Sequence, residues 1–341
     1  MINPLTREQV RRAIKHTGPE RVPVMFHFWL HTENFPGREA EINSVLNSYP
    51  CDAELIIPVL PGYDESPFKD IPEYVWIRDA KRIPNAAHDA RCIMPSWDGL
   101  DKIISEFPNP DMLEIYHKAA ERIKSLNPGT YRLGHFWFTL YERLWSFRGM
   151  ENALVDFFEN PREVEALFGA LTGFYIGMIK NFARIGCDGV YVTDDLGTQA
   201  GMMFSPEIFR RFFKPYYKKM IDAAHGLGME FWLHSCGNIR EIIGDLVEIG
   251  LDVLHPIQKY AMDEKKVAAE WGGKLCVFSG FDLQQILPFE TPENVRREVR
   301  FLIETFNRAD GGLMLTAGNE ITGDVPLENI RALFNEAFKI R

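Results

Sequence analysis

The chain has 341 residues, of which 46% are hydrophobic and 25% charged, and this composition excludes collagen-like, low-complexity and wholly disordered proteins. Its 38 Lys and Arg stand against 48 Asp and Glu, a net charge of −10. Such an acidic chain is a poor candidate for nucleic-acid binding, because the phosphate backbone favours a basic face. Residues 1–20 contain no apolar secretory signal, no run of 18 apolar residues predicts a membrane span, and the five cysteines are widely spaced. We therefore expect a cytoplasmic protein with reduced thiols.

Eight short apolar runs alternate with amphipathic stretches along the chain. Strands separated by helical segments indicate βαβ units and a parallel sheet, and eight such units predict a (β/α)8 TIM barrel of the α/β class. A doubly wound open sheet is the competing interpretation, weakened because no G-x-G-x-x-G motif follows the first run. In chain order, the runs are 22–28, 53–59, 131–137, 189–195, 230–236, 253–257, 275–280 and 313–318.

Helical periodicity and capping residues predict the segments between the strands. Ser205 and Thr291 each precede a proline and a glutamate, which is typical of a helix N-terminus. A typical barrel uses about 250 residues. We assign the remainder to an N-terminal helical extension at 1–20 and to an insertion at 61–110 over the barrel mouth, with a hairpin of 74–78 and 90–94. The absence of linkers and repeats predicts one domain spanning 1–341, and its helices are expected at 6–15, 161–185, 205–227, 294–306 and 326–338.

Polar side chains follow several predicted strands, where the catalytic residues of a barrel lie. We expect Asp194, Asp195 and His255 to be catalytic, although a lone histidine at a strand end is often only a structural hydrogen-bonding group. Nearby aromatics such as Trp29 favour core packing, although some could form an apolar wall for a ligand. The residues that we expect to bind substrate are His27, His135, Gln199, Gln258, Asp282 and Asn319.

The sharpest local motif is His234-Ser235-Cys236-Gly237. Residues two apart in a strand point the same way, so the imidazole and the thiolate would face one pocket. This pair suits zinc, and Glu320 after the last run could supply the third ligand that zinc requires. The alternatives are a barrel-lining histidine, a buried cysteine and a solvated loop glutamate.

Asp194 and Asp195 are adjacent at the end of the fourth run, so their side chains should point in opposite directions. One carboxylate is expected to face the mouth, where it could accept substrate N–H groups or act as acid or base. The other would cap a helix or face a loop. The sequence favours neither residue for either role.

These residues are part of a wider resemblance. It is carried by DGVYVTDD, FSPEIF, FKPY, LHSCGN and DVPLENI, at 188–195, 204–209, 213–216, 233–238 and 324–330. As a set they resemble the uroporphyrinogen decarboxylase superfamily over most of residues 130–340. The resemblance implies a (β/α)8 barrel. It leaves the reaction open, because the superfamily also contains cobalamin-dependent methyltransferases.

Two branches of the superfamily differ at positions visible here. The decarboxylases carry M-R-Q-A-G-R after the first strand, and those arginines form ion pairs with the many carboxylates of the substrate. This chain reads MFHFWLH at 25–31, and no arginine occurs from this stretch up to Arg38. The zinc methyltransferases carry H-x-C-G and a later cysteine. This chain keeps His234, Cys236 and Gly237, but has Gly-Asn-Glu at 318–320 instead of the cysteine.

The resemblance therefore implies, first, a zinc-dependent methyltransferase acting with methylcobalamin on a corrinoid protein, with a dimer as the expected assembly. In that chemistry an acceptor thiolate attacks the methyl group on cobalt, and cobalt leaves with the electron pair. A variant without zinc, using a carboxylate near a pterin, is also possible. The second hypothesis is decarboxylation of a porphyrinogen or another pyrrolic or aromatic acid, with Asp194 or Asp195 accepting pyrrole N–H bonds. The third is a non-catalytic barrel that binds a small molecule.

Overall fold

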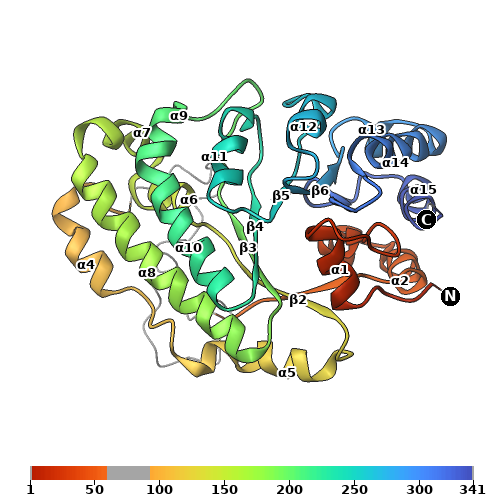
Figure 1. Cartoon of the computed structure of the whole chain (residues 1–341), viewed down its shortest axis with the longest axis horizontal. Coiled ribbons are helices and arrows are strands. Elements are labelled where there is room, and N and C mark those ends of the chain that lie inside the picture. Colours follow the sequence, from red (N-terminus) through yellow and green to blue (C-terminus); the bar gives the residue numbers. More distant parts are fainter. Residues whose placement is uncertain (1, 60–92, 340–341) are drawn as a thin grey trace.

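The computed structural model of the chain describes residues 2–59 and 93–339. Within them, a parallel sheet of seven strands runs in chain order, each strand hydrogen-bonded to the next along the sequence. Helices pack against the outer face of this sheet (Figure 1). The strands are β1 (Ala53–Ile56), β2 (Tyr131–Phe136), β3 (Gly189–Thr193), β4 (Glu230–His234), β5 (Val253–His255), β6 (Cys276–Phe281) and β7 (Leu313–Ala317).

The run at 22–28 is not the strand that the sequence predicts. Val24 makes one parallel bridge to Leu315 of β7, and its carbonyl accepts a bond of 3.2 Å from Asp52 N–H, just before β1. The chain then turns into a 3-10 helix at Phe26–Phe28. The turn sends Phe26 against Phe334 on the outside and Phe28 against Phe278 of β6. An apolar run alone does not distinguish this turn from a strand.

The two faces of the sheet bury separate cores. The inner core combines side chains from every strand, such as Tyr191 of β3 and Trp232 of β4, with Val10 and Ile14 of helix α1 (Arg7–Ile14). Helix α1 begins at Thr6, whose hydroxyl accepts a bond from Gln9 N–H at 3.4 Å. It fills one end of the sheet's interior and leaves the carboxyl ends of the strands for the site.

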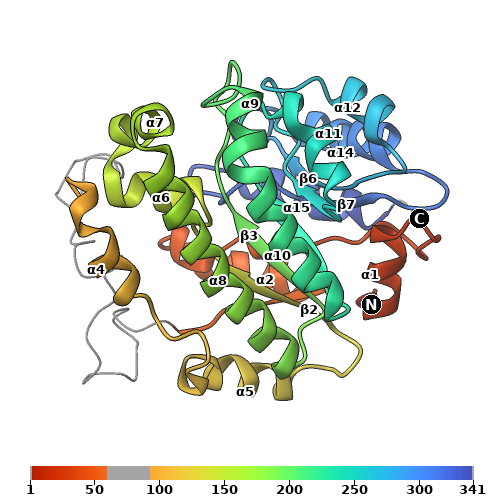
Figure 2. The same cartoon turned by 60° about the vertical axis from the view of Figure 1, so that its left-hand side comes forward.

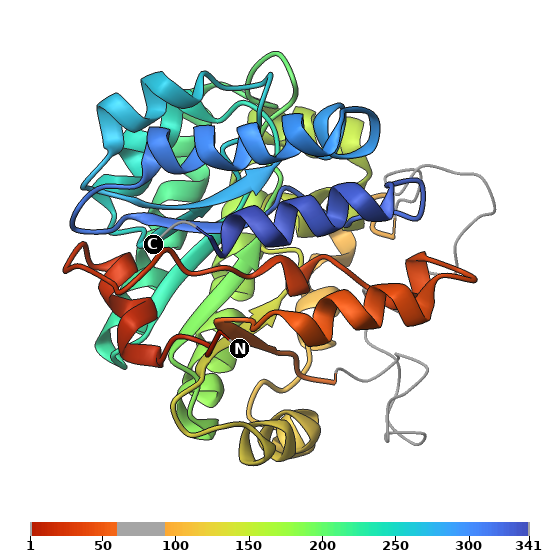
Figure 3. The same cartoon turned by 90° about the vertical axis from the view of Figure 1, so that its right-hand side faces the viewer.

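The outer core lies between the sheet and its helices, and the views agree that α8 and α10 run side by side there (Figures 1 and 2). Helices α2 and α15 lie together near the chain termini (Figure 3). The helices are α2 (Glu39–Ser48), α4 (Leu100–Ser105), α5 (His117–Ser125), α6 (Tyr141–Arg148), α7 (Met150–Glu159), α8 (Pro161–Ile185), α9 (Pro206–Ile208), α10 (Lys214–Gly226), α11 (Ile243–Glu248), α12 (Glu264–Trp271), α13 (Ile286–Phe289), α14 (Pro292–Phe306) and α15 (Leu327–Ala337).

The predicted helices are confirmed, with one difference. The segment at 205–227 divides into α9, a π-helical turn at Phe209–Phe213, and α10. In the part of the chain that the structure describes, α8 alone is long and apolar enough to cross a membrane, and more than half of that stretch is buried inside the fold. The predicted hairpin and most of the insertion at 61–110 lie outside the described residues; its end forms α4, preceded by a 3-10 turn at Trp97–Gly99.

Candidate metal and ligand site

The register of β3 and β4 brings an aspartate to the H-x-C pair. Thr193 of β3 is paired in parallel with His234 of β4. Two residues beyond that pair, Asp195 is level with Cys236, whose backbone N–H donates to Asp195 Oδ1 at 2.8 Å. Three side chains that lie on two neighbouring strand ends therefore meet at one point.

Two glycines let the loops after β3 and β4 approach closely. Gly237 has a φ of +85°, and a Cβ at this position would lie 2.3 Å from the carbonyl carbon of Gly197. Beside this contact, Leu196 N–H donates to Ser235 Oγ at 3.0 Å. Only glycine fits at 237 without moving backbone, so the contact fixes the spacing of the two loops.

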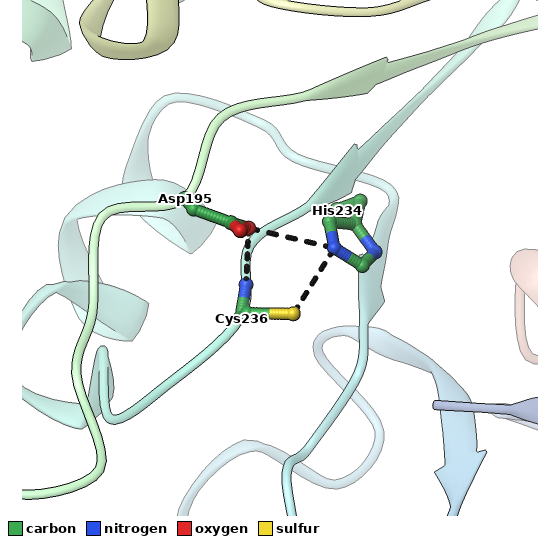
Figure 4. A group of neighbouring side chains, drawn as sticks. All are labelled: Asp195, His234 and Cys236. Atoms are coloured by element: carbon green, nitrogen blue, oxygen red, sulfur yellow. Dashed lines mark hydrogen bonds and ion pairs between the residues drawn. The ribbon is translucent and has the colours of Figure 1, made fainter. Parts of the chain in front are cut away.

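The side chains of Asp195, His234 and Cys236 converge (Figure 4). His234 Nε2 lies 3.2 Å from Cys236 Sγ and 3.4 Å from Asp195 Oδ1, and the donor atoms of all three residues lie within 4.8 Å of one another. Neighbouring donors in a tetrahedral zinc site, with bonds of about 2.0–2.3 Å, are about 3.3–3.8 Å apart. The separations from His234 are close to this range, so a single small metal ion fits between the three residues.

A chain of hydrogen bonds decides which nitrogen of His234 carries a proton. His255 Nε2 lies 3.0 Å from the carbonyl oxygen of Ala317, which can only accept, so His255 is protonated there. Burial holds the pKa of His255 well below its ordinary value and keeps the ring neutral. Its Nδ1 is therefore an acceptor, and it faces His234 Nδ1 at 2.7 Å. In neutral His234, the Nε2 lone pair consequently points toward Cys236 and Asp195.

Without a metal ion, the three side chains form an ion-paired cluster. Burial opposes protonation of His234, but the neighbouring Cys236 sulfur and the Asp195 carboxylate outweigh it and raise the pKa of His234 to about 10. Burial also opposes ionisation of Asp195, yet its bonds to His234 and Cys236 hold its pKa below the ordinary value. The sulfur and the carboxylate thus favour a positive charge beside them, which a divalent cation would supply in place of the proton.

Asp194 points away from this cluster and caps helix α6. Its Oδ2 accepts from Leu140 N–H and Tyr141 N–H, each at 3.1 Å, and from the Tyr217 hydroxyl at 2.6 Å. Its Oδ1 accepts from Glu142 N–H at 2.8 Å, and the side chain is fully buried. The geometry therefore gives the predicted catalytic Asp194 a structural role, because four donors already occupy its carboxylate.

Aromatic rings surround the two histidines. Trp29 stacks on His255 with ring centroids 5.5 Å apart and planes at 15°. The Tyr191 hydroxyl lies 2.8 Å from His255 Nδ1, so it shares that acceptor with His234. Sequence reasoning missed Tyr191, because an aromatic residue inside an apolar strand is typical of core packing.

His135, predicted to bind substrate, lies beside this cluster. Its Nδ1 bonds to the Tyr191 carbonyl at 2.9 Å, and its ring stacks on the Tyr191 ring at 5.0 Å. Burial lowers the pKa of His135 to about 4, so the ring is neutral. Its Nδ1 donates to the carbonyl, and its Nε2 therefore carries a lone pair.

A cavity of about 120 Å³ opens beside Cys236, where β5, β6 and β7 end. Three predicted substrate-binding residues line it, namely Gln258, Asp282 and Asn319, and Pro256 forms part of its apolar wall. Gln258 Oε1 accepts from Gly237 N–H at 2.6 Å, which joins the cavity wall to the loop that carries Cys236. The cavity is small compared with the roughly 300–1,000 Å³ of drug-sized sites, so it suits a small molecule.

Three predicted site residues lie apart from the cluster. His27 faces α2, with Nε2 3.1 Å from the Leu46 carbonyl. Gln199 is exposed in the loop after β3. Glu320 is 53% exposed and lies 4.0 Å from His31 Nε2, outside the group of three donors. The turn after β7 directs Glu320 outward, so the geometry assigns the third donor to Asp195 instead.

Comparison with known proteins shows the family and the fold of the chain. The family model described as uroporphyrinogen decarboxylase matches residues 102–339. A solved structure, a methyltransferase from Methanosarcina mazei, superposes with a TM-score of 0.65 and covers 98% of this chain and 99% of that one. At 16% identity this likeness shows a shared fold.

Two curated relatives match by sequence over part of their length. Both are methylcobamide:CoM methyltransferases MtbA. The protein from Methanosarcina acetivorans is 22% identical over 178 residues, which cover 52% of this chain and 50% of that protein. The protein from Methanosarcina mazei is 24% identical over 170 residues, covering 50% and 47% respectively. The matched region thus spans about half the length of these relatives.

Proposed function

Because the chain belongs to the uroporphyrinogen decarboxylase family, we propose that it is a zinc-dependent methyltransferase that moves a methyl group between a corrinoid protein and a small thiol acceptor. The observation that carries this proposal is the convergence of His234, Cys236 and Asp195 at the carboxyl ends of β3 and β4. The similarity to two curated methyltransferases supports it.

The donor set suits zinc. Imidazole, thiolate and carboxylate are all zinc ligands, and three protein ligands leave a fourth position for a substrate. One thiolate and one carboxylate balance the charge of a divalent ion, just as two thiolates would, so Asp195 compensates for the cysteine that the methyltransferase branch carries after its last strand. Zinc bound there would lower the pKa of an acceptor thiol that coordinates it.

The surrounding residues of the chain have separate tasks. His255 holds the His234 ring through Nδ1 and keeps Nε2 free of a proton toward the metal position. Trp29 covers the histidine pair and limits its contact with water. The cavity beside Cys236 would hold the acceptor next to the sulfur, and the amides of Gln258 and Asn319 would orient it.

Decarboxylation is the alternative that the family membership leaves open. That reaction needs a free carboxylate at the pocket to stabilise a protonated ring. Asp194 is saturated by four donors, and Asp195 is held by Cys236 N–H and paired with His234. The geometry thus favours methyl transfer over a carboxylate-only reaction.

Metal analysis tests the proposal directly. Purified protein should contain about one zinc ion per chain, and His234→Ala, Cys236→Ala and Asp195→Asn should lose it. Loaded protein should transfer a methyl group from methylcobalamin to a small thiol, followed by the absorbance of the corrinoid. Cys51→Ser is a matched control, because Cys51 lies outside the donor group.

Two outcomes would contradict this assignment. One is wild-type protein that binds no zinc at micromolar concentration. The other is release of carbon dioxide from a porphyrinogen that persists in Cys236→Ala. Full zinc content in Cys51→Ser, with the fold of all variants verified by thermal unfolding, would show that losses at the three ligands are specific.

A further inference from the structure

The described charged groups in and directly behind the wall of the cavity beside Cys236 are more negative than positive. Lys259 is the one cation among the described residues that line it. Its ammonium is paired with Glu264 at 3.1 Å and with Glu298 at 2.7 Å. Both carboxylates are about nine-tenths buried. The ammonium is therefore already neutralised before any ligand arrives.

A third carboxylate lies in the wall itself. Asp282 lines the cavity, and its oxygens accept N–H bonds from Gln284 at 3.2 Å, Gln285 at 3.0 Å and Ile286 at 2.7 Å. These bonds hold the carboxylate in place without cancelling its charge. Among the described residues, one ammonium against three carboxylates leaves the region net negative, and a negative charge placed next to it is strongly disfavoured.

Two further polar side chains of the wall, Gln258 and Asn319, are uncharged amides. Gln258 uses its carbonyl oxygen to accept Gly237 N–H at 2.6 Å, and Asn319 uses its own to accept Glu320 N–H at 2.8 Å. In the part of the chain that the structure describes, both amide NH2 groups are left for a ligand. Two neutral donors suit a carbonyl, hydroxyl or amide oxygen.

Backbone contacts define the size of the cavity. A Cβ at Gly280 would lie 2.4 Å from Pro256 Cβ and 2.6 Å from Gly318 Cα, so this part of the wall is packed main chain. Phe281 and Leu283 add apolar surface. The space is thus small and bounded by groups that cannot move aside at little cost.

We infer that the ligand of this cavity is a small uncharged molecule with a polar oxygen, and that anionic ligands are excluded. That the ligand is a thiol rests on the proposed function. If the ligand is the methyl acceptor, it is an uncharged thiol rather than one that bears a carboxylate or a sulfonate. Selectivity comes from Asp282 and from the Glu264 and Glu298 carboxylates that neutralise Lys259.

An isosteric ligand pair tests this inference. β-Mercaptopropionamide and β-mercaptopropionate have nearly the same shape and differ in charge. By calorimetry on the zinc-loaded protein, the amide should bind at least about tenfold more tightly than the carboxylate. Equal affinity, or tighter binding of the carboxylate, would overturn the inference.

Two variants identify the source of the selectivity. Glu298→Gln leaves part of the Lys259 charge without a partner. The ratio of the affinities for the amide and the carboxylate should therefore fall several-fold. Glu304→Gln, an exposed position on the same helix α14 and outside the cavity wall, should leave it unchanged. Glu264→Gln repeats the test should Glu298→Gln fold poorly, and an unchanged ratio in a folded variant would contradict the charge explanation.

Metal-free Cys236→Ser separates this inference from the proposed function. The amide should still bind more tightly than the carboxylate there, because the selective groups are not metal ligands. A protein that binds no zinc but keeps this order would refute the methyltransferase proposal and leave the cavity inference standing. Loss of the order in folded Cys236→Ser would count against the cavity inference alone.

Discussion

His234 and His255 face each other through their Nδ1 atoms at 2.7 Å, and this contact sets the state of the site. The Ala317 carbonyl fixes the proton of His255 on Nε2, so His234 must donate from Nδ1. His255 on β5 and Ala317 on β7 lie outside the group of three donors. They nevertheless leave the nitrogen of neutral His234 that faces Cys236, Nε2, without a proton. Partners of this kind hold a ligating imidazole in one tautomer and orientation.

Replacing His255 should weaken metal binding without removing a ligand. His255→Leu takes away the acceptor for His234 Nδ1–H, and zinc affinity should fall about 10- to 100-fold. His255→Gln keeps a carbonyl oxygen that can accept the bond and should recover most of the affinity. Competition with a chelator measures the zinc affinity of both variants. Wild-type affinity in a folded His255→Leu protein would show that the contact does not matter.

The two adjacent aspartates should respond differently to the same change. Asp195→Asn should lose zinc, and in the metal-free protein it should lose less stability than Asp194→Asn, because its amide oxygen can still accept the Cys236 N–H bond. Asp194→Asn turns an amide NH2 group toward the backbone N–H donors at the start of α6. The free energy of unfolding should therefore fall by about 1–3 kcal/mol. Chemical denaturation and metal analysis of both variants distinguish the roles. Identical behaviour of the pair would refute the assignment.

Strand alternation was enough to predict part of this site. It placed His234 and Cys236 on the same side and the two aspartates on opposite sides. Which aspartate faces the cluster depends on the pairing of Thr193 with His234 and on where α6 begins. Both are tertiary facts that the local pattern does not contain.

The third donor of the cluster shows the limit of the sequence more clearly. Glu320 follows the last strand and has suitable chemistry, but its side chain is directed outward toward His31. The apolar run at 22–28 was predicted as a strand for a similar reason: its residues are buried, yet Phe26 and Phe28 pack on opposite sides of a turn. In both cases the residue types suited the predicted role, but the path of the backbone placed the side chains elsewhere.

Glu142 should make stability depend on pH. Burial, together with the nearby Asp195 and Asp194, raises its pKa from about 4.5 to about 8. The folded protein therefore holds a proton that the unfolded chain releases, and the free energy of unfolding should fall as pH rises from 4.5 to 8. Glu142→Gln can still accept the Thr193 hydroxyl bond and should lose this dependence, which is on the order of a few kcal/mol at most.

Urea unfolding of the metal-free protein at several pH values measures the effect. The stability of Glu142→Gln relative to wild type should increase across that interval and then level off. Glu151→Gln, at an exposed position on α7, is the control and should follow wild type. A constant difference between Glu142→Gln and wild type at all pH values would show that Glu142 ionises normally in the fold.

Gly237 should be the position where a single methyl group damages both fold and site. It has a φ of +85°, and an added Cβ would meet the backbone of Gly197 at 2.3 Å, whereas Gly228, with a φ of +72°, has open space around it. Gly228→Ala should cost about 1 kcal/mol from backbone strain alone. Gly237→Ala must in addition push the two loops apart, so its loss of stability should be larger and zinc affinity should fall with it. Because the two substitutions are chemically the same, equal stability losses, or undiminished zinc binding in Gly237→Ala, would mean that this contact does not hold Asp195 against Cys236.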